Sequence, residues 1–198
     1  MSQYIYNRLY IDELNQYADA FSDCYPLFSN VNQQFTNSEI NYVGDKINII
    51  TENQLTAEEE NTLDSIVNEV NNNAYANILE EFKENKIDEI RNENQQLLFE
   101  KGAEFPPGSG VRFAMRDTDM SIWNGMILAA NSFTYPITVR DVNNIPHSFN
   151  SPSEIQQFWG TGLAYVQSVF DSTVEKITEV KNLTTITDVL NWTDDRLE

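Results

Sequence analysis

The chain has 198 residues, 40% of them hydrophobic, and its 12 basic and 31 acidic residues give a formal net charge of −19. A surface of this charge repels the phosphates of nucleic acids and the headgroups of anionic lipids, so neither a nucleic acid nor a membrane is an expected partner. A single cysteine, Cys24, excludes an intrachain disulfide and a site built from several thiolates.

The start of the chain lacks the basic residues and the apolar run of a secretion signal. No apolar stretch approaches the roughly 20 residues that a membrane-spanning helix needs. We therefore expect the protein to be made and folded in a cytoplasm, which includes the cytoplasm of an infected host cell.

Residues 1–55 predict a small β-α-β-β unit. Aromatic and aliphatic residues crowd together in residues 4–11, which is typical of a short strand. Asp12 is in position to cap a helix, because apolar residues follow at spacings of three and four as far as Phe21. Pro26 is expected to end that helix, since proline interrupts the helical hydrogen bonds.

A β-hairpin is predicted in residues 39–50. Polar and apolar residues alternate on both sides of Gly44 and Asp45, and these two residue types favour a tight turn. The hairpin leaves strand edges in residues 42–50 that another chain can extend. We therefore expect residues 1–55 to dock the protein onto a partner.

Residues 56–99 predict an acidic connecting helix or a pair of helices. Thr56 and Glu59 have the spacing of a capping box, in which each side chain binds the backbone N–H of the other residue. Three asparagines at residues 71–73 separate two apolar stripes, so the sequence leaves open one helix or two. The stripes comprise Leu63, Ile66, Val67 and Val70, and then Ile78, Leu79, Phe82, Ile87 and Ile90.

Residues 100–198 predict a C-terminal domain of short strands packed with two or three helices. Prolines and glycines in residues 106–110 are expected to stop the preceding helix. Strands are predicted in residues 111–115 and 133–139, with a short helix in residues 120–131 between them.

Two further capping signals organise the end of the chain. Ser151 and Glu154 form a second capping box with proline at the first helical position, and the helix should run to about Lys181. Thr185 is in position to cap a last short helix. Together with the preceding regions, these elements predict an α+β fold.

Few residues are spaced for chemistry. Asp117 and Asp119 can share a hard cation, but the glycine and further ligands of a calcium loop do not follow, so we interpret them as a solvated turn. His147 is the only histidine, is predicted in a loop, and has no nucleophile motif to accompany it. Residues 160–162 read Gly-Thr-Gly within a helical pattern, which favours close packing over nucleotide binding. We therefore expect no catalytic residues, no metal site and no cofactor.

The order of these elements resembles a family of bacteriophage proteins. The chain reads LTAEE at residues 55–59 and LDSIV at residues 63–67, which is similar to a junction in many proteins associated with tail fibres. In that family the junction leads into a C-terminal domain of unknown function. The domain has an N-terminal helix, a short β-segment with a conspicuous aspartate, a small helix, a long helix and a short Thr-capped helix. The matching pieces are residues 86–91, 111–119, 123–130, 154–181 and 183–192.

The resemblance implies a structural component of a phage virion at the tail, baseplate or fibre junction, which acts through protein–protein contacts. It implies other tail or baseplate proteins and further copies of the chain as partners. The family has no established catalytic residues, so no active site is carried over and the protein is not expected to be an enzyme. Two alternatives stay open: a tail-fibre assembly chaperone that is absent from the virion, and a hydrolase acting on host surface polysaccharide.

The predicted contact surface follows from the apolar stripes, which hold more apolar side chains than a monomer of this size is expected to bury. The interface candidates are the apolar and aromatic residues of the hairpin and the stripes, namely Tyr42, Ile47, Ile49, Ile66, Val70, Ile78, Phe82 and Ile90.

Overall fold

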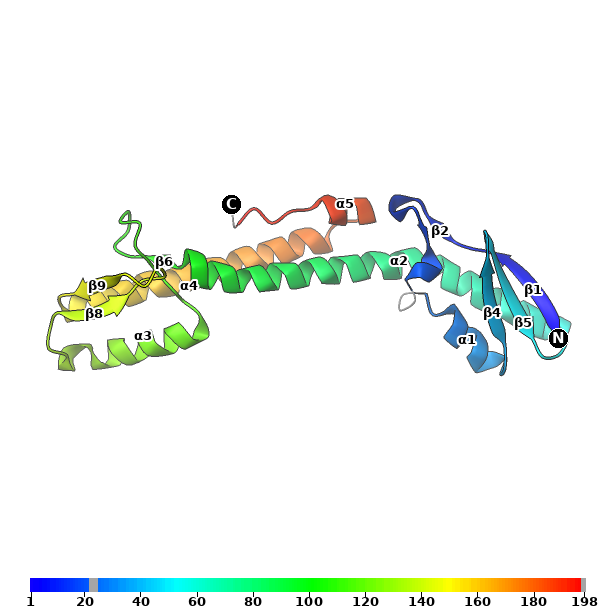
Figure 1. Ribbon diagram of the computed structural model, residues 1–198, viewed down its shortest axis with the longest axis horizontal. Helices are drawn as coiled ribbons and strands as arrows, with labels where there is room; N and C mark the ends of the chain where they lie inside the picture. Colours follow the sequence, from blue (N-terminus) through cyan, green and yellow to red (C-terminus); the bar gives the residue numbers. More distant parts are fainter. Residues whose placement is uncertain (22–24, 197–198) are drawn as a thin grey trace. The chain divides into compact units, whose positions relative to one another are not determined.

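The computed structural model describes residues 1–21 and 25–196, so Cys24 lies outside the described residues. The chain has an α+β fold (Figure 1) and forms two compact units. Unit 1 comprises Met1–Asn85 and Thr184–Asn191, and unit 2 comprises residues 86–183 with the described tail 192–196. The boundary therefore falls inside the segment predicted to connect two domains, and residues 184–191 join the first unit.

A three-stranded antiparallel sheet in unit 1 has the order β1-β5-β4. Its strands are β1 (Ser2–Asn7), β4 (Glu39–Val43) and β5 (Lys46–Thr51). The predicted hairpin is confirmed, with β4 and β5 joined by a turn at residues 44–45. Because β5 is paired on both sides, the open sheet edges belong to β4 and β1.

The helix expected after Asp12 is wrong. Asn15 adopts a left-handed φ of 53°, so the chain reverses there and β2 (Tyr10–Ile11) pairs with β3 (Gln16–Tyr17). Asparagine tolerates this conformation better than most residues, and the spacing of apolar residues does not reveal it. The residues between and after these strands form short 3-10 turns, Asp12–Leu14 and Ala18–Ala20.

The helix of this region is instead α1 (Leu27–Gln34), which sequence reasoning missed in a polar stretch. Leu27 and Val31, four residues apart, are its two fully buried residues. Pro26 precedes the first turn, where a missing backbone N–H costs no helical hydrogen bond. Proline therefore opens a helix here and does not end one.

Helix α2 (Ala57–Gln96) is continuous through the three asparagines, which settles the open alternative in favour of one helix. The predicted capping box is present: the Thr56 N–H donates to Glu59 Oε2 at 2.7 Å, and the Glu59 N–H donates to Thr56 Oγ1 at 3.3 Å. A π-helical turn, Leu97–Lys101, follows α2. Gly102 then has φ +56°, and a Cβ there would lie 2.4 Å from the Phe113 carbonyl oxygen.

The core of unit 1 lies between the sheet, α1, the first half of α2 and α5 (Ile186–Asn191). Thr185 caps α5 as predicted, because the Asp188 N–H donates to Thr185 Oγ1 at 3.1 Å. Ile186 is fully buried, and its backbone N–H donates to Glu13 Oε2 at 3.2 Å. The fully buried apolar residues of this core are Ala18, Leu27, Val31, Ile47, Ile49, Leu63, Ala74, Ile78 and Ile186.

Unit 2 contains two short hairpins and two helices besides the end of α2. The predicted strands are shorter than expected, at β7 (Arg112–Phe113) and β8 (Ile137–Arg140). They pair with β6 (Ala103–Glu104) and β9 (Pro146–Phe149), respectively.

Helix α3 (Asp117–Ala129) begins three residues earlier than predicted and continues into a 3-10 turn at Ala130–Ser132. Helix α4 (Pro152–Lys181) has the predicted bounds, and its Glu154 N–H donates to Ser151 Oγ at 3.3 Å. None of the helices in the described ranges combines the length and the apolarity that crossing a bilayer requires.

We predict that Ile186→Ala will destabilise unit 1, although this residue lies about a hundred positions after the main segment of that unit. Removal of a fully buried isoleucine side chain costs about 2–5 kcal/mol. Urea unfolding followed by far-ultraviolet circular dichroism measures the loss. Leu190→Ala is the matched control, because Leu190 lies on the same helix and is 50% exposed. Equal losses in the two variants would contradict the assigned role of Ile186.

Candidate functional site

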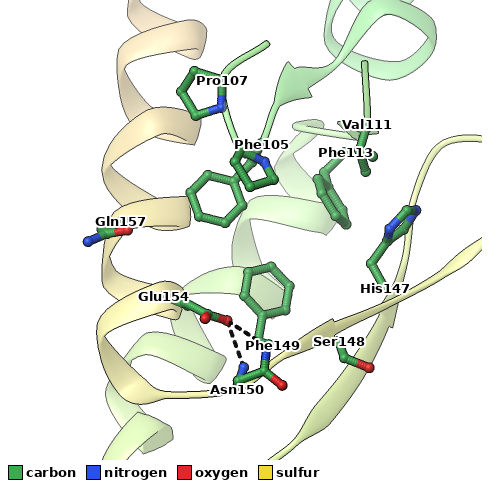
Figure 2. A pocket seen from close by; sticks show the side chains of 11 residues that line it. Phe105, Pro107, Val111, Phe113, His147, Ser148, Phe149, Asn150, Glu154 and Gln157 are labelled. Carbon is green, nitrogen blue, oxygen red and sulfur yellow. Dashed lines mark hydrogen bonds between the residues drawn. The ribbon is translucent and has the colours of Figure 1, made fainter. Parts of the chain in front are cut away.

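Unit 2 contains a cleft of about 420 Å³ (Figure 2). Three phenylalanines and two prolines form much of its wall, and the remaining side chains are mostly polar. The lining residues come from three parts of the chain: the segment from Phe105 to Phe113, the segment from His147 to Asn150, and the start of α4. The lining residues are Phe105, Pro106, Pro107, Val111, Phe113, His147, Ser148, Phe149, Asn150, Glu154 and Gln157.

The aromatic floor of the cleft belongs to the core of unit 2. Phe105 stacks on Phe149 with ring centroids 5.8 Å apart and an interplanar angle of 15°. Phe158 meets Phe105 edge-on at 5.6 Å, and it also contacts Phe113 and Phe149. Each of these rings therefore contacts at least two others, and the floor is a packed aromatic cluster.

The loop that forms one rim is closed by hydrogen bonds. The Phe105 N–H donates to the Val111 carbonyl at 2.9 Å, and the Gly110 N–H donates to Glu104 Oε1 at 2.6 Å. The predicted stop segment 106–110 is therefore an ordered loop that holds its prolines over the floor.

His147 lies on strand β9, so its predicted position in a loop is wrong. Its Nε2 is 2.9 Å from Asp141 Oδ2. Asp141 also accepts hydrogen bonds from the backbone N–H groups of Asn143 and Ile145, at 2.9 and 2.8 Å. Burial opposes ionisation of Asp141, but the hydrogen bonds from Ile145, His147 and Asn143 outweigh it and hold its pKa below the usual value. An ionised Asp141 thus orients His147.

The neighbouring hydroxyl does not complete a catalytic triad with this pair. Side chains alternate along β9, so Ser148 is exposed between the partly buried His147 and the buried Phe149. The histidine–aspartate pair of the described cleft is therefore a positioned hydrogen-bonding group without an adjacent nucleophile.

Glu154 supplies the only carboxylate among the residues that line the cleft. Its Oε2 accepts the Asn150 N–H at 2.7 Å and the Asn150 side-chain amide at 3.4 Å (Figure 2). Glycoside hydrolases ordinarily need two carboxyl groups about 5–9.5 Å apart on either side of the scissile bond. The lining therefore does not supply the pair that the polysaccharide-hydrolase alternative needs.

Asp117 and Asp119 do not lie in a turn, which corrects the sequence interpretation. They belong to the first turn of α3, where negative side chains favour the helix dipole. Asp119 Oδ2 accepts the Arg116 N–H at 3.2 Å and the Arg116 Nε–H at 2.7 Å. Within the described residues no group of three or more histidine, cysteine, aspartate or glutamate side chains is arranged to hold a metal ion.

The structure places most interface candidates inside the chain's own cores. Five of the eight are buried, so they present no surface to a partner and the interface prediction is wrong for them: Ile47, Ile49, Val70, Ile78 and Ile90. Ile66 and Phe82 are partly buried against the core of unit 1. Tyr42 is 39% exposed and lies on the edge strand β4. The apolar stripes of α2 are thus explained by packing within each unit.

A second group of interacting charges holds the tail of unit 2. The Arg196 guanidinium donates to both oxygens of Asp194 and, at 2.9 Å, to Asn94 Oδ1 and Thr173 Oγ1. Trp192 packs against Ile87, Ile90 and Val180. The tail is therefore anchored on α2 and α4 by one aromatic contact and one partly buried arginine. The sequence did not predict this group, because its residues come from α2, α4 and the tail and share no motif or spacing.

Glu93 completes this group. Its Oε2 is buried without a donor facing it. Burial, followed by a hydrogen bond to Asp194 and the charge of that carboxylate, raises the pKa of Glu93 to about 7. Protonation of Glu93 lets its carboxyl group donate a hydrogen bond to Asp194. It also removes one of two neighbouring negative charges, and so relieves the repulsion between the two side chains.

No family model matches the chain, and no curated protein or solved structure is similar enough to carry an inference. The candidate site therefore rests on the geometry of these side chains.

The two glycines of residues 160–162 give a matched prediction. A Cβ at Gly160 meets no atom within 4 Å, whereas a Cβ at Gly162 would lie 2.9 Å from Met115 Cε. We expect Gly160→Ala to stabilise unit 2 by about 1 kcal/mol through helix propensity. Gly162→Ala should lose most of that gain, because Met115 is buried and must move. Urea unfolding followed by tryptophan fluorescence tests this, since Trp123, Trp159 and Trp192 all lie in unit 2. Equal gains would contradict close packing at Gly162.

The stability of unit 2 should fall as the pH rises from about 5 to 8. The pKa of Glu93 is raised on folding, so its contribution is fully present below the pKa of an unfolded glutamate and is lost as the pH rises through about 7. Glu93→Gln should flatten this dependence in urea unfolding monitored by tryptophan fluorescence. Glu100→Gln, at an exposed position on unit 2, should keep the slope of the unmodified protein. An unchanged slope in Glu93→Gln would exclude Glu93 as its source.

Proposed function

We propose that this protein is a structural component of a bacteriophage virion, at the tail, baseplate or fibre junction, and that it acts through protein–protein contacts and not as an enzyme. The observation that carries the proposal is an uncharged, partly apolar strip on the exposed face of α4. The resemblance of residues 55–192 to tail-fibre-associated proteins supplies the phage context.

The order of elements from α2 onward supports this resemblance. A helix is followed by a short β-segment, β7, and then by the small helix α3, which begins at Asp117. The long helix α4 and the short Thr-capped helix α5 come after it. These elements come in the order that the resemblance implies for residues 86–192, and the chain adds β6 before β7 and the β8–β9 hairpin between α3 and α4.

The strip on α4 consists of residues on one face of the helix: Leu163, Gln167, Phe170, Val174 and Thr178. Its apolar members are well exposed, with Leu163 at 45%, Phe170 at 51% and Val174 at 65%. The strip itself holds no charged residue, although the exposed Asp171 and Glu175 lie beside it and Gln167 donates to Asp171 Oδ1 at 2.8 Å. Exposed apolar side chains that gather in this way favour an interaction surface. The partly apolar strip therefore marks the contact that unit 2 makes in an assembly.

Spacing indicates what covers the strip. Leu163 and Phe170 are seven residues apart, and Val174 follows after four, which is the spacing by which one helix packs along another. A second copy of α4 has the same spacing of apolar residues, so two copies can pack along each other without a further protein. We therefore assign the strip to self-association of the protein.

We predict that Phe170→Glu will shift the protein from an oligomer to a monomer in sedimentation equilibrium. A charge in a buried helix contact costs several kcal/mol, which outweighs the loss of one apolar contact. Ser168→Glu adds the same charge to the same helix about 160° around its axis from Phe170, where it should leave the oligomer intact. A protein that is monomeric at all concentrations would contradict self-association through α4.

The virion role is tested separately by mass spectrometry of purified phage particles. A structural component is expected at a fixed ratio to the major tail proteins. Presence in the infected cell but absence from mature particles would instead support an assembly chaperone.

A further inference from the structure

The cleft of unit 2 presents two polar groups on opposite sides of an aromatic floor. Figure 2 shows Glu154 on one side of Phe149 and His147 on the other, with Pro107 above. Glu154 comes from α4 and His147 from β9, so two separate elements hold them. A ligand that lies over the floor meets both groups.

The carboxylate of Glu154 is a hydrogen-bond acceptor that faces the cleft. Glu154 uses Oε2 for Asn150, and no hydrogen bond to its Oε1 occurs among the described residues. His147 Nε2 is 2.9 Å from Asp141 Oδ2, and this contact fixes the imidazole on the other side of the floor. The cleft therefore favours a ligand that donates hydrogen bonds.

Charge narrows the choice further. No lysine or arginine is among the lining residues, and Glu154 is the one carboxylate there. The start of α4 carries about half a positive charge from the helix dipole, but the carboxylate of Glu154 outweighs it. A chain of net charge −19 also attracts cations at longer range.

We propose that this cleft binds a basic side chain, an arginine or a lysine, presented by a segment of a partner protein. The methylene stem packs against Phe105, Phe149 and the prolines of the rim, and the cationic head pairs with Glu154. Aromatic rings add a favourable interaction with a cation. The inference goes beyond the proposed function and does not require self-association through α4.

The probes are blocked Gly-Xaa-Gly tripeptides in which the central residue is arginine, lysine, citrulline or glutamate. Titration is followed by amide chemical shifts of the full-length protein. We expect the arginine and lysine peptides to shift the resonances of His147, Asn150 and Glu154. Citrulline keeps the shape of arginine but lacks the charge, and it should bind at least about tenfold more weakly.

Glu154→Gln is the decisive variant, because glutamine keeps an acceptor for the Asn150 N–H while it removes the charge. It should weaken arginine binding by about tenfold with the spectrum otherwise unchanged. Glu175→Gln removes the same charge at an exposed position of α4 and should bind like the unmodified protein. Equal binding by arginine and citrulline, undiminished binding by Glu154→Gln, or shifts produced by a neutral dextran oligosaccharide but by no peptide would each overturn the proposal.

Discussion

Both units of the protein depend on the burial of apolar residues from a single helix, α2. Its first half contributes Leu63, Val67 and Ile78 to the core of unit 1. Ile87 and Ile90, further along the same helix, pack in unit 2. A 40-residue helix whose apolar residues face different ways along its length has little net amphipathicity, and this is why its stripes drift in the sequence. Burial fixes α2, and the sheet of unit 1 and the helix α4 of unit 2 are fixed by packing on it.

The sequence predicted best the features that local chemistry determines. The capping residues Thr56 and Ser151 located the starts of α2 and α4, because a side chain that binds a nearby backbone N–H acts over three residues. The helix expected after Asp12 failed because one backbone conformation, at Asn15, overrode the apolar spacing. The cleft was not predictable at all. Phe105 lies about 40 to 50 residues before His147 and Glu154 along the chain, and only the tertiary fold brings it to them.

The interface candidates show a related limit. An apolar stripe indicates that a helix packs against another surface, but it does not indicate whether that surface belongs to the same chain. Ile78 and Ile90 are buried within the chain's own cores, whereas Phe170 and Val174 are exposed. Exposure in the structure separates the two cases, and it moved the expected contact surface from α2 to α4. The polar residues of the cleft likewise became apparent only from the structure, because the sequence identified Glu154 only as part of a helix cap.

The return of α5 to unit 1 affects how the protein folds during synthesis. Ile186 belongs to a core whose other buried residues end at Ile78. A ribosome adds about 5–20 residues per second, so the hundred or so intervening residues take roughly 5–20 s to make. Throughout this interval the nascent chain exposes the site that Ile186 fills. Unit 1 therefore completes its core only when residues 184–191 have left the ribosome, and we expect a chain broken off before α5 to be a substrate for chaperones and proteases.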